Sequence, residues 1–294
     1  MMGSALASAA QTTLLVLVAL SSLSVLSPTQ CAEKIGVVTT IHPLGEFIEA
    51  IGGDKVAVTV MVPPGSEPHT YEPSPSQMRQ VAQAKIYIEN GAGLESWMNN
   101  IIGSNKRMLL VDSSKNVTFI RSGAGPSEGS RGIDPHIWLS ARNAQAQIRN
   151  IYQGLALVDP SNQEYYIKNR DAYLQKLKAL DGDLNKTFSK HTGNRKFIVL
   201  HPAWAYFARD YGLEEIAINL EEKDPGPRYL SEVIDTAMKN NITTIFVEPQ
   251  FSPKMADVIS REIGGKVVSL DPLAENYLEN MRLMGQKIAD SLRP

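Results

Sequence analysis

Cysteine is almost absent from this sequence, since Cys31 is the only one among 294 residues. No disulfide bond can therefore form within the chain, which excludes a small scaffold held together by disulfides. Long runs of one charge sign are absent too, because 29 basic and 31 acidic residues leave a formal net charge of -2. A chain without a basic patch lacks the electrostatic signature of nucleic-acid binding. We expect no nucleic-acid partner.

Charged side chains are also missing from the start of the chain, where Glu33 is the first acidic or basic residue. The apolar run at 14–20, flanked by Ala and Ser, resembles a secretory signal without its usual basic residues. Residues 1–32 are expected to be a signal peptide or an N-terminal anchor, which makes the protein exported, periplasmic or attached to the cell surface. Two interpretations of Cys31 stay open, lipid attachment or an incidental thiol, because residues 27–30 match a bacterial lipobox poorly.

From Lys34 onward, short apolar runs rich in β-branched residues alternate with segments of helical period, which is typical of βα units around parallel sheets. The predicted strands are residues 34–40, 55–62, 85–89, 107–112, 196–200, 214–219, 243–248 and 266–270. The predicted helices of the second half are residues 202–211, 228–240, 252–263 and 275–292. The expected fold class is α/β, with two similar lobes that each hold a mostly parallel four-stranded sheet flanked by helices.

One long helix is expected between the halves, over residues 160–190, where no proline interrupts a stripe of apolar side chains at helical spacing. The stripe consists of Ile167, Leu174, Leu177, Leu180, Leu184 and Phe188. At about 1.5 Å per residue such a helix spans about 45 Å, enough to connect two lobes rigidly. The predicted domains are a first lobe at 33–159, the connecting helix at 160–191 and a second lobe at 192–294.

Helix ends carry their own signals. Ser74-Pro75 and Ser252-Pro253 each place a capping hydroxyl before a proline suited to the first helical position. Gly103, Gly212 and Gly264 are suited to left-handed positions after helix C-termini.

Only five histidines occur in the chain, and most of them lie where a predicted strand passes into a loop. His69 lies in the loop after the second strand, His201 directly follows the fifth, and Asp271 directly follows the eighth. His136 lies in the loop before the helix predicted near residue 143. Open α/β sheets bind their ligands at the carboxyl ends of the strands, so these four side chains are predicted to form one site.

Three imidazoles and one carboxylate make a four-coordinate set that suits zinc. Manganese normally takes more oxygen ligands, so we expect Zn²⁺ with Mn²⁺ as the alternative. Two further residues leave their roles open. His42 either reaches the site or caps the first helix, and Glu248 either bonds a ligating histidine or caps the helix that follows it. His191, at the polar end of the long helix, is left out of the site.

Five stretches of this chain carry a family resemblance. They are Val62-Pro63-Pro64-Gly65-Ser66-Glu67-Pro68-His69-Thr70-Tyr71-Glu72-Pro73-Ser74-Pro75, Asp134-Pro135-His136-Ile137-Trp138-Leu139, His201-Pro202-Ala203-Trp204-Ala205-Tyr206-Phe207, Glu248-Pro249-Gln250-Phe251-Ser252 and Asp271-Pro272. Together they resemble the metal-specific substrate-binding proteins of zinc and manganese ABC importers. In that family the lobes are joined by one long helix.

The resemblance implies metal ligation by His69, His136, His201 and Asp271, one pair from each lobe. It also implies delivery of the ion to an importer permease with its ATPase, by a monomeric protein. Histidine at position 201 is similar to the zinc-type or mixed branch, since members with glutamate there are associated with manganese. Many zinc-specific members also carry a histidine-rich loop, whereas residues 121–132 contain no histidine.

Three alternatives remain at this point. A zinc hydrolase would use an open coordination position and a general base, for which Glu248 is the candidate, but four protein ligands argue against catalysis. A surface adhesin would be expected to show repeats or a stalk, and none is evident. A receptor for haem, cobalamin or a siderophore would not need four converging metal ligands. We therefore expect a binding protein and not an enzyme.

Overall fold

The computed structural model describes residues 34–98, 103, 105–121, 132–219 and 225–292, so residues 1–32 with Cys31, and most of the 121–132 loop, lie outside the described part. The strands of the first sheet are β1 (Ile35–Thr39), β2 (Val56–Val60), β3 (Ile86–Glu89) and β4 (Leu109–Asp112). Those of the second are β5 (Lys196–Val199), β6 (Glu214–Ala217), β7 (Thr244–Val247) and β8 (Lys266–Ser269). All the pairings between them are parallel.

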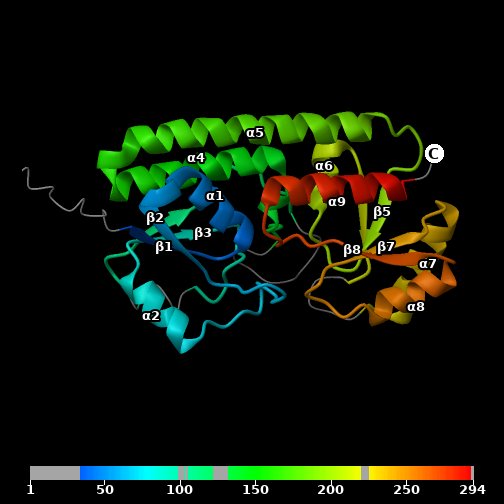
Figure 1. Cartoon of the computed structure of the whole chain (residues 1–294). Helices are drawn as coiled ribbons and strands as arrows, with labels where there is room; N and C mark the ends of the chain where they lie inside the picture. The colour runs from blue at the N-terminus through cyan, green and yellow to red at the C-terminus, as the bar shows by residue number, and fades with distance from the viewer. Residues whose placement is uncertain (1–33, 99–102, 104, 122–131, 220–224, 293–294) are drawn as a thin grey trace, which may run out of the picture. The chain divides into compact units, whose positions relative to one another are not determined.

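The two sheets share one topology, with strand orders β2-β1-β3-β4 and β6-β5-β7-β8 (Figure 1). In both sheets the first strand of the lobe lies at the centre and the chain then builds outward on either side. Helices cover the sheets, as parallel strands buried on both faces require. The prediction of two similar α/β lobes is confirmed.

The helices are α1 (His42–Gly52), α2 (Pro75–Gln83), α4 (Ala141–Val158), α5 (Gln163–Ser189), α6 (Ala205–Tyr211), α7 (Pro227–Lys239), α8 (Lys254–Glu262) and α9 (Tyr277–Ser291). Short 3₁₀-helices occupy Gly53–Lys55, Ile137–Leu139 and Pro160–Asn162. No helix within the described ranges is long and apolar enough to span a membrane.

Helix α5 is the predicted connecting helix, with 27 residues and a length of about 40 Å. It packs along α4 of the first lobe and α9 of the second (Figure 1). Its buried face holds five of the six predicted stripe residues. Ile167 is only half-buried, and Tyr166 and Tyr173 take buried positions in its place. Their hydroxyls donate to Asp159 and Glu46, which lets these polar side chains join the core.

One hydrophobic core runs through both lobes. It joins Phe47 of α1 and Ile148 of α4 to Leu180 of α5, Phe207 of α6 and Met284 of α9, all of them buried. The described residues belong to one compact unit. The lobe boundaries near residues 159 and 192 stay a prediction.

The two Ser-Pro signals have different outcomes. Ser74 caps α2 with a full capping box, in which its side chain accepts from the backbone N–H of Gln77 and the side chain of Gln77 reaches back. Ser252 caps nothing, because α8 begins only at Lys254 and Pro253 occupies its N-cap position. Gly212 and Gly264 have φ angles of 66° and 62°, as left-handed C-terminal positions require.

Two helical glycines give opposite predictions for stability. Gly182 lies exposed in α5, where an added Cβ meets nothing within 4 Å, so Gly182→Ala should raise the free energy of unfolding by about 1 kcal/mol. Gly285 lies in α9 against α5, and its Cβ would come within 2.3 Å of Leu184 Cδ2. Gly285→Ala should therefore lower the free energy of unfolding, by about 1 to 3 kcal/mol. Chemical denaturation of both variants measures this, and a shift of the same sign in both would contradict the packing described here.

Candidate metal centre

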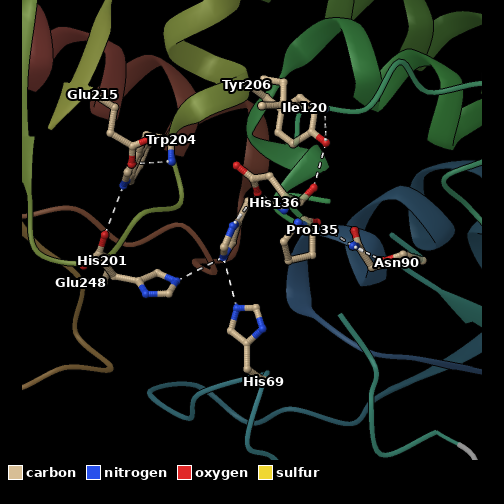
Figure 2. Close-up of polar contacts among 12 residues, drawn as sticks. His69, Asn90, Ile120, Pro135, His136, His201, Trp204, Tyr206, Glu215 and Glu248 are labelled. Atoms are coloured by element: carbon tan, nitrogen blue, oxygen red, sulfur yellow. Dashed lines mark hydrogen bonds and ion pairs between the residues drawn. The ribbon is translucent and has the colours of Figure 1, made fainter. Parts of the chain in front are cut away.

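Three histidines from separate loops converge at the carboxyl edges of the two sheets (Figure 2). His69 comes from the loop between β2 and α2, His136 immediately precedes the 3₁₀-helix at 137–139, and His201 follows β5. The Nε2 atom of His136 lies 3.3 Å from Nε2 of His69 and 3.3 Å from Nε2 of His201. One nitrogen from each ring lies within 4.8 Å of the other two. Three of the four side chains predicted from the sequence to form one site thus lie together, and their role as metal ligands stays a prediction.

Asp134 determines how the His136 ring is oriented. Its Oδ1 atom accepts hydrogen bonds from the backbone N–H of His136 at 2.9 Å and from Nδ1 at 2.8 Å. Because Nδ1 donates to the carboxylate, Nε2 faces the other two histidines. A carboxylate on the far nitrogen of a ligating histidine is the usual partner at metal sites, where it fixes the ring and raises its basicity. This contact of Asp134 was not predicted from the sequence, although Asp134 lies only two residues before His136.

The three rings differ in their affinity for protons. Burial, reinforced by the nearby His136, lowers the pKa of His69 to about 3 and that of His201 well below 6.5. Burial also lowers the pKa of His136, but the Asp134 carboxylate outweighs it and raises the pKa above 6.5 overall. His136 is thus the ring that takes up a proton, and two neutral rings face its Nε2 as acceptors. A metal ion entering the site competes with this one proton.

The space between the rings is a cavity of about 20 Å³. A water molecule needs at least about 10 to 15 Å³ of such space, so the cavity has room for one occupant of about that size, such as a single ion. Organic ligands occupy sites of about 300 to 1,000 Å³, so this cavity does not fit haem, cobalamin or a siderophore. Apolar groups of Trp138, Ala203 and Leu273 line it. The ring of Phe251 stacks on His201, with centroids 4.8 Å apart.

Glu67 is a cavity-lining carboxylate that the sequence analysis quoted but did not single out. Its Oε1 atom lies 3.8 Å from Nε2 of His69 and accepts the backbone N–H of His69 at 3.0 Å. Burial raises the pKa of Glu67 above 4.5. The signal available in the sequence was the position of Glu67, two residues before the predicted ligand His69. Glu67 therefore offers an oxygen donor on the same loop as His69.

Asp271 lies at the predicted strand end, after β8, but its carboxylate is not part of the converging group among the described residues. Its Oδ1 atom accepts from the backbone N–H of Leu273 at 3.0 Å and from Nε2 of Gln250 at 3.3 Å. Gln250 lines the cavity, and Asp271 does not. Asp271 therefore contacts Gln250, a residue of the cavity wall, and does not itself reach the cavity. Its role as a ligand stays a prediction.

Glu248 is buried beside the cavity, and its Oε1 atom accepts from the indole Nε1 of Trp204 at 3.1 Å. Glu215 accepts the backbone N–H of the same tryptophan at 3.0 Å (Figure 2). Burial raises the pKa of each of these carboxyls to about 7. Glu248 and Glu215 together hold Trp204, which lies three positions after His201. The predicted bond from Glu248 to a histidine ring is not among the described hydrogen bonds, and its Oε2 atom has no partner there.

His42 is the first residue of α1, which makes it a helix-start residue. Its Nδ1 atom lies 3.8 Å from Oε1 of Glu275, near the start of α9, and it does not line the cavity. His191 packs near Phe188 at the end of α5, with ring centroids 6.4 Å apart, which is consistent with leaving it out of the site.

The Asp134 contact leads to a prediction for Asp134→Asn. Loss of the carboxylate charge should lower the pKa of His136, and loss of ring orientation should weaken zinc binding by about 10- to 100-fold. Histidine NMR titration of the metal-free protein measures the first effect and zinc competition the second. Asp112→Asn is the matched control, because that carboxylate bonds Ser114 and no histidine. An unchanged pKa at His136 in a folded Asp134→Asn protein would contradict the assignment.

Comparison with known proteins places this geometry in a family. The family model described as zinc-uptake complex component A, periplasmic (ZnuA), matches residues 37–291. The high-affinity zinc uptake system protein ZnuA of Bacillus subtilis is 32% identical over 253 residues, covering 82% of this chain and 79% of that protein. The manganese-binding lipoprotein MntA of Halalkalibacterium halodurans is 30% identical over 256 residues, covering 86% and 82%.

Solved structures agree with the sequence comparison. A crystal structure of ZnuA superposes with a TM-score of 0.84 at 39% identity, and the match covers 89% of this chain and 100% of that one. The fold, the position of the histidines and the sequence comparison thus lead to the same conclusion. The chain belongs to the ZnuA family of periplasmic zinc-uptake components.

Proposed function

We propose that this protein is the extracytoplasmic solute-binding component of an ABC importer, which captures one Zn²⁺ ion between its lobes and delivers it to the permease. The observation that carries the proposal is the convergence of His69, His136 and His201 on a cavity that holds one ion. Two rings come from the first lobe and one from the second. Family membership supports the importer role.

The chemistry of the donors favours zinc over manganese. Three imidazole nitrogens suit zinc, whereas manganese prefers carboxylate, carbonyl and water oxygens. Burial keeps two of the three rings neutral near pH 7, which is the form that binds metal. Relatives named for zinc and for manganese both occur, so the choice of metal rests on this donor set.

A bound ion crosslinks the lobes in this proposal, because its ligands come from both. The continuous core through α5 limits hinge motion, and Trp138 of the first lobe also donates its indole N–H to the carbonyl of Pro272 in the second at 2.9 Å. Capture therefore involves small adjustments of loops. The metal-loaded surface of a monomeric protein is then recognised by the permease, whose ATPase drives transport.

Family membership does not support the hydrolase alternative. The base candidate Glu248 is already bonded to Trp204, in a cavity too small for an ion together with an organic substrate. The proposal also includes export through residues 1–32 and attachment to a membrane surface through Cys31 or the N-terminal segment. A relative named as a lipoprotein supports attachment.

Metal analysis and zinc–manganese competition on the purified protein test the function. We expect one zinc per chain and tighter binding of zinc than of manganese. His201→Ala should weaken zinc binding by more than the roughly 100-fold that loss of an outer hydrogen-bond partner costs. His191→Ala removes a histidine outside the cavity and should leave affinity unchanged. Stoichiometric zinc at unchanged affinity in His201→Ala would refute the site.

A second pair of variants tests which residue supplies the fourth metal-binding atom beside the three histidines. We propose that Glu67 completes the site, because it lines the cavity close to His69, whereas Asp271 lies behind Gln250. Glu67→Gln should then weaken zinc binding by at least about 10-fold, and Asp271→Asn should have a smaller effect. Zinc competition titrations of both variants measure the difference. A larger loss of zinc affinity in Asp271→Asn than in Glu67→Gln would show that Asp271, and not Glu67, is the fourth ligand.

A further inference from the structure

The hydroxyl of Tyr206 connects the second lobe to the loop that carries His136. Tyr206 lies in α6, and its side chain is fully buried. Its hydroxyl donates to the backbone carbonyl of Asp134 at 2.8 Å and accepts the backbone N–H of Ile120 at 3.1 Å. Asp134 and Ile120 are themselves joined by a backbone hydrogen bond of 2.9 Å. The side chain of Tyr206, which belongs to the second lobe, thus holds the backbone of the first lobe at two places, Ile120 and Asp134 (Figure 2).

Tyr206 also lies close in the chain to His201. Four residues separate them, across the turn from β5 into α6. On the other side of the hydrogen bond, Asp134 lies two residues before His136. The hydrogen bond between Tyr206 and Asp134 therefore lies only a few residues along the chain from both His201 and His136. The Nε2 atoms of these two rings, His136 and His201, lie 3.3 Å apart.

The first lobe holds the neighbouring carbonyl. Nδ2 of Asn90 donates to the carbonyl of Pro135 at 2.8 Å, and the backbone N–H of Asn90 donates to Oε1 of the buried Glu95 at 2.6 Å. Successive carbonyls before His136 are thus fixed from different lobes, Asp134 by the second and Pro135 by the first (Figure 2). The position of His136 depends on where the two lobes lie relative to each other.

We infer that Tyr206 is a positioning residue that sets zinc affinity by fixing the distance between His136 and His201. This inference rests on the proposed function. Metal sites need their ligands within about 0.5 Å of the binding geometry before the ion arrives, held by the residues behind them. Without the hydroxyl, the Asp134 carbonyl loses its contact with the second lobe. The ion must then order the loop itself, which weakens binding.

Tyr206→Phe in the full chain tests the inference, because it removes the hydroxyl and keeps the ring. Zinc competition against a chromophoric chelator should show binding weakened by about 10- to 100-fold, the range for outer partners of metal ligands. Tyr229→Phe is the matched control. Its hydroxyl donates to the carbonyl of Ala217 at 2.7 Å, within the second lobe and away from the cavity, so zinc affinity should stay that of the wild type.

The visible absorption spectrum of the Co²⁺-loaded proteins separates positioning from loss of stability. It should change in Tyr206→Phe, because it reports ligand geometry, and should stay like the wild type in Tyr229→Phe. Equal affinities and equal spectra in the two variants would overturn the inference while wild-type zinc binding stands. Absence of zinc binding in the wild type, with no further loss in His201→Ala, would overturn the proposed function itself and the inference with it.

Discussion

The hydrogen bond between Asp134 and His136 is the contact on which the rest of the site depends. Three imidazole nitrogens lie close together in a buried cavity. Although burial lowers the pKa of His136, the Asp134 carboxylate raises it overall, so this ring takes up a proton more readily than His69 or His201. The same bond presents Nε2 to an incoming ion. A metal ion competes with protons for these rings, and Asp134 places a negative charge beside His136.

The sequence could predict which edge of each sheet carries the site. Parallel strands with β-branched residues are recognisable in sequence, and their carboxyl ends are where ligands gather. His69 and His201 therefore converge as expected. Asp271 follows its strand just as closely, yet its oxygen bonds the backbone two residues on. Position in the chain predicts the edge of the sheet, but local hydrogen bonding decides where a carboxylate points.

Sequence patterns did not predict which side chains make contacts between the two lobes. Tyr206 lies in the stretch 201–207 that resembles the importer family, and only the structure shows its hydroxyl meeting the Asp134 carbonyl. Ser74 and Ser252 show the same limit at short range, since both precede a proline. Ser74 caps α2. Before Ser252, the chain makes a turn from Glu248 to Phe251, and the ring of Phe251 stacks on His201. Helix α8 then starts only at Lys254. A tertiary contact displaced the local preference there.

The unbroken core along α5 has a consequence for how the molecule fails. Leu180, Phe47 and Phe207 belong to one buried cluster that both lobes share, so each lobe loses part of its apolar cover when the other one opens. Each lobe keeps a smaller buried cluster of its own. Two independent domains would melt in separate steps and could leave one half intact. A shared core couples them, so unfolding of one lobe weakens the packing of the other. Loss of His201 with the second lobe and loss of His69 and His136 with the first are thereby linked.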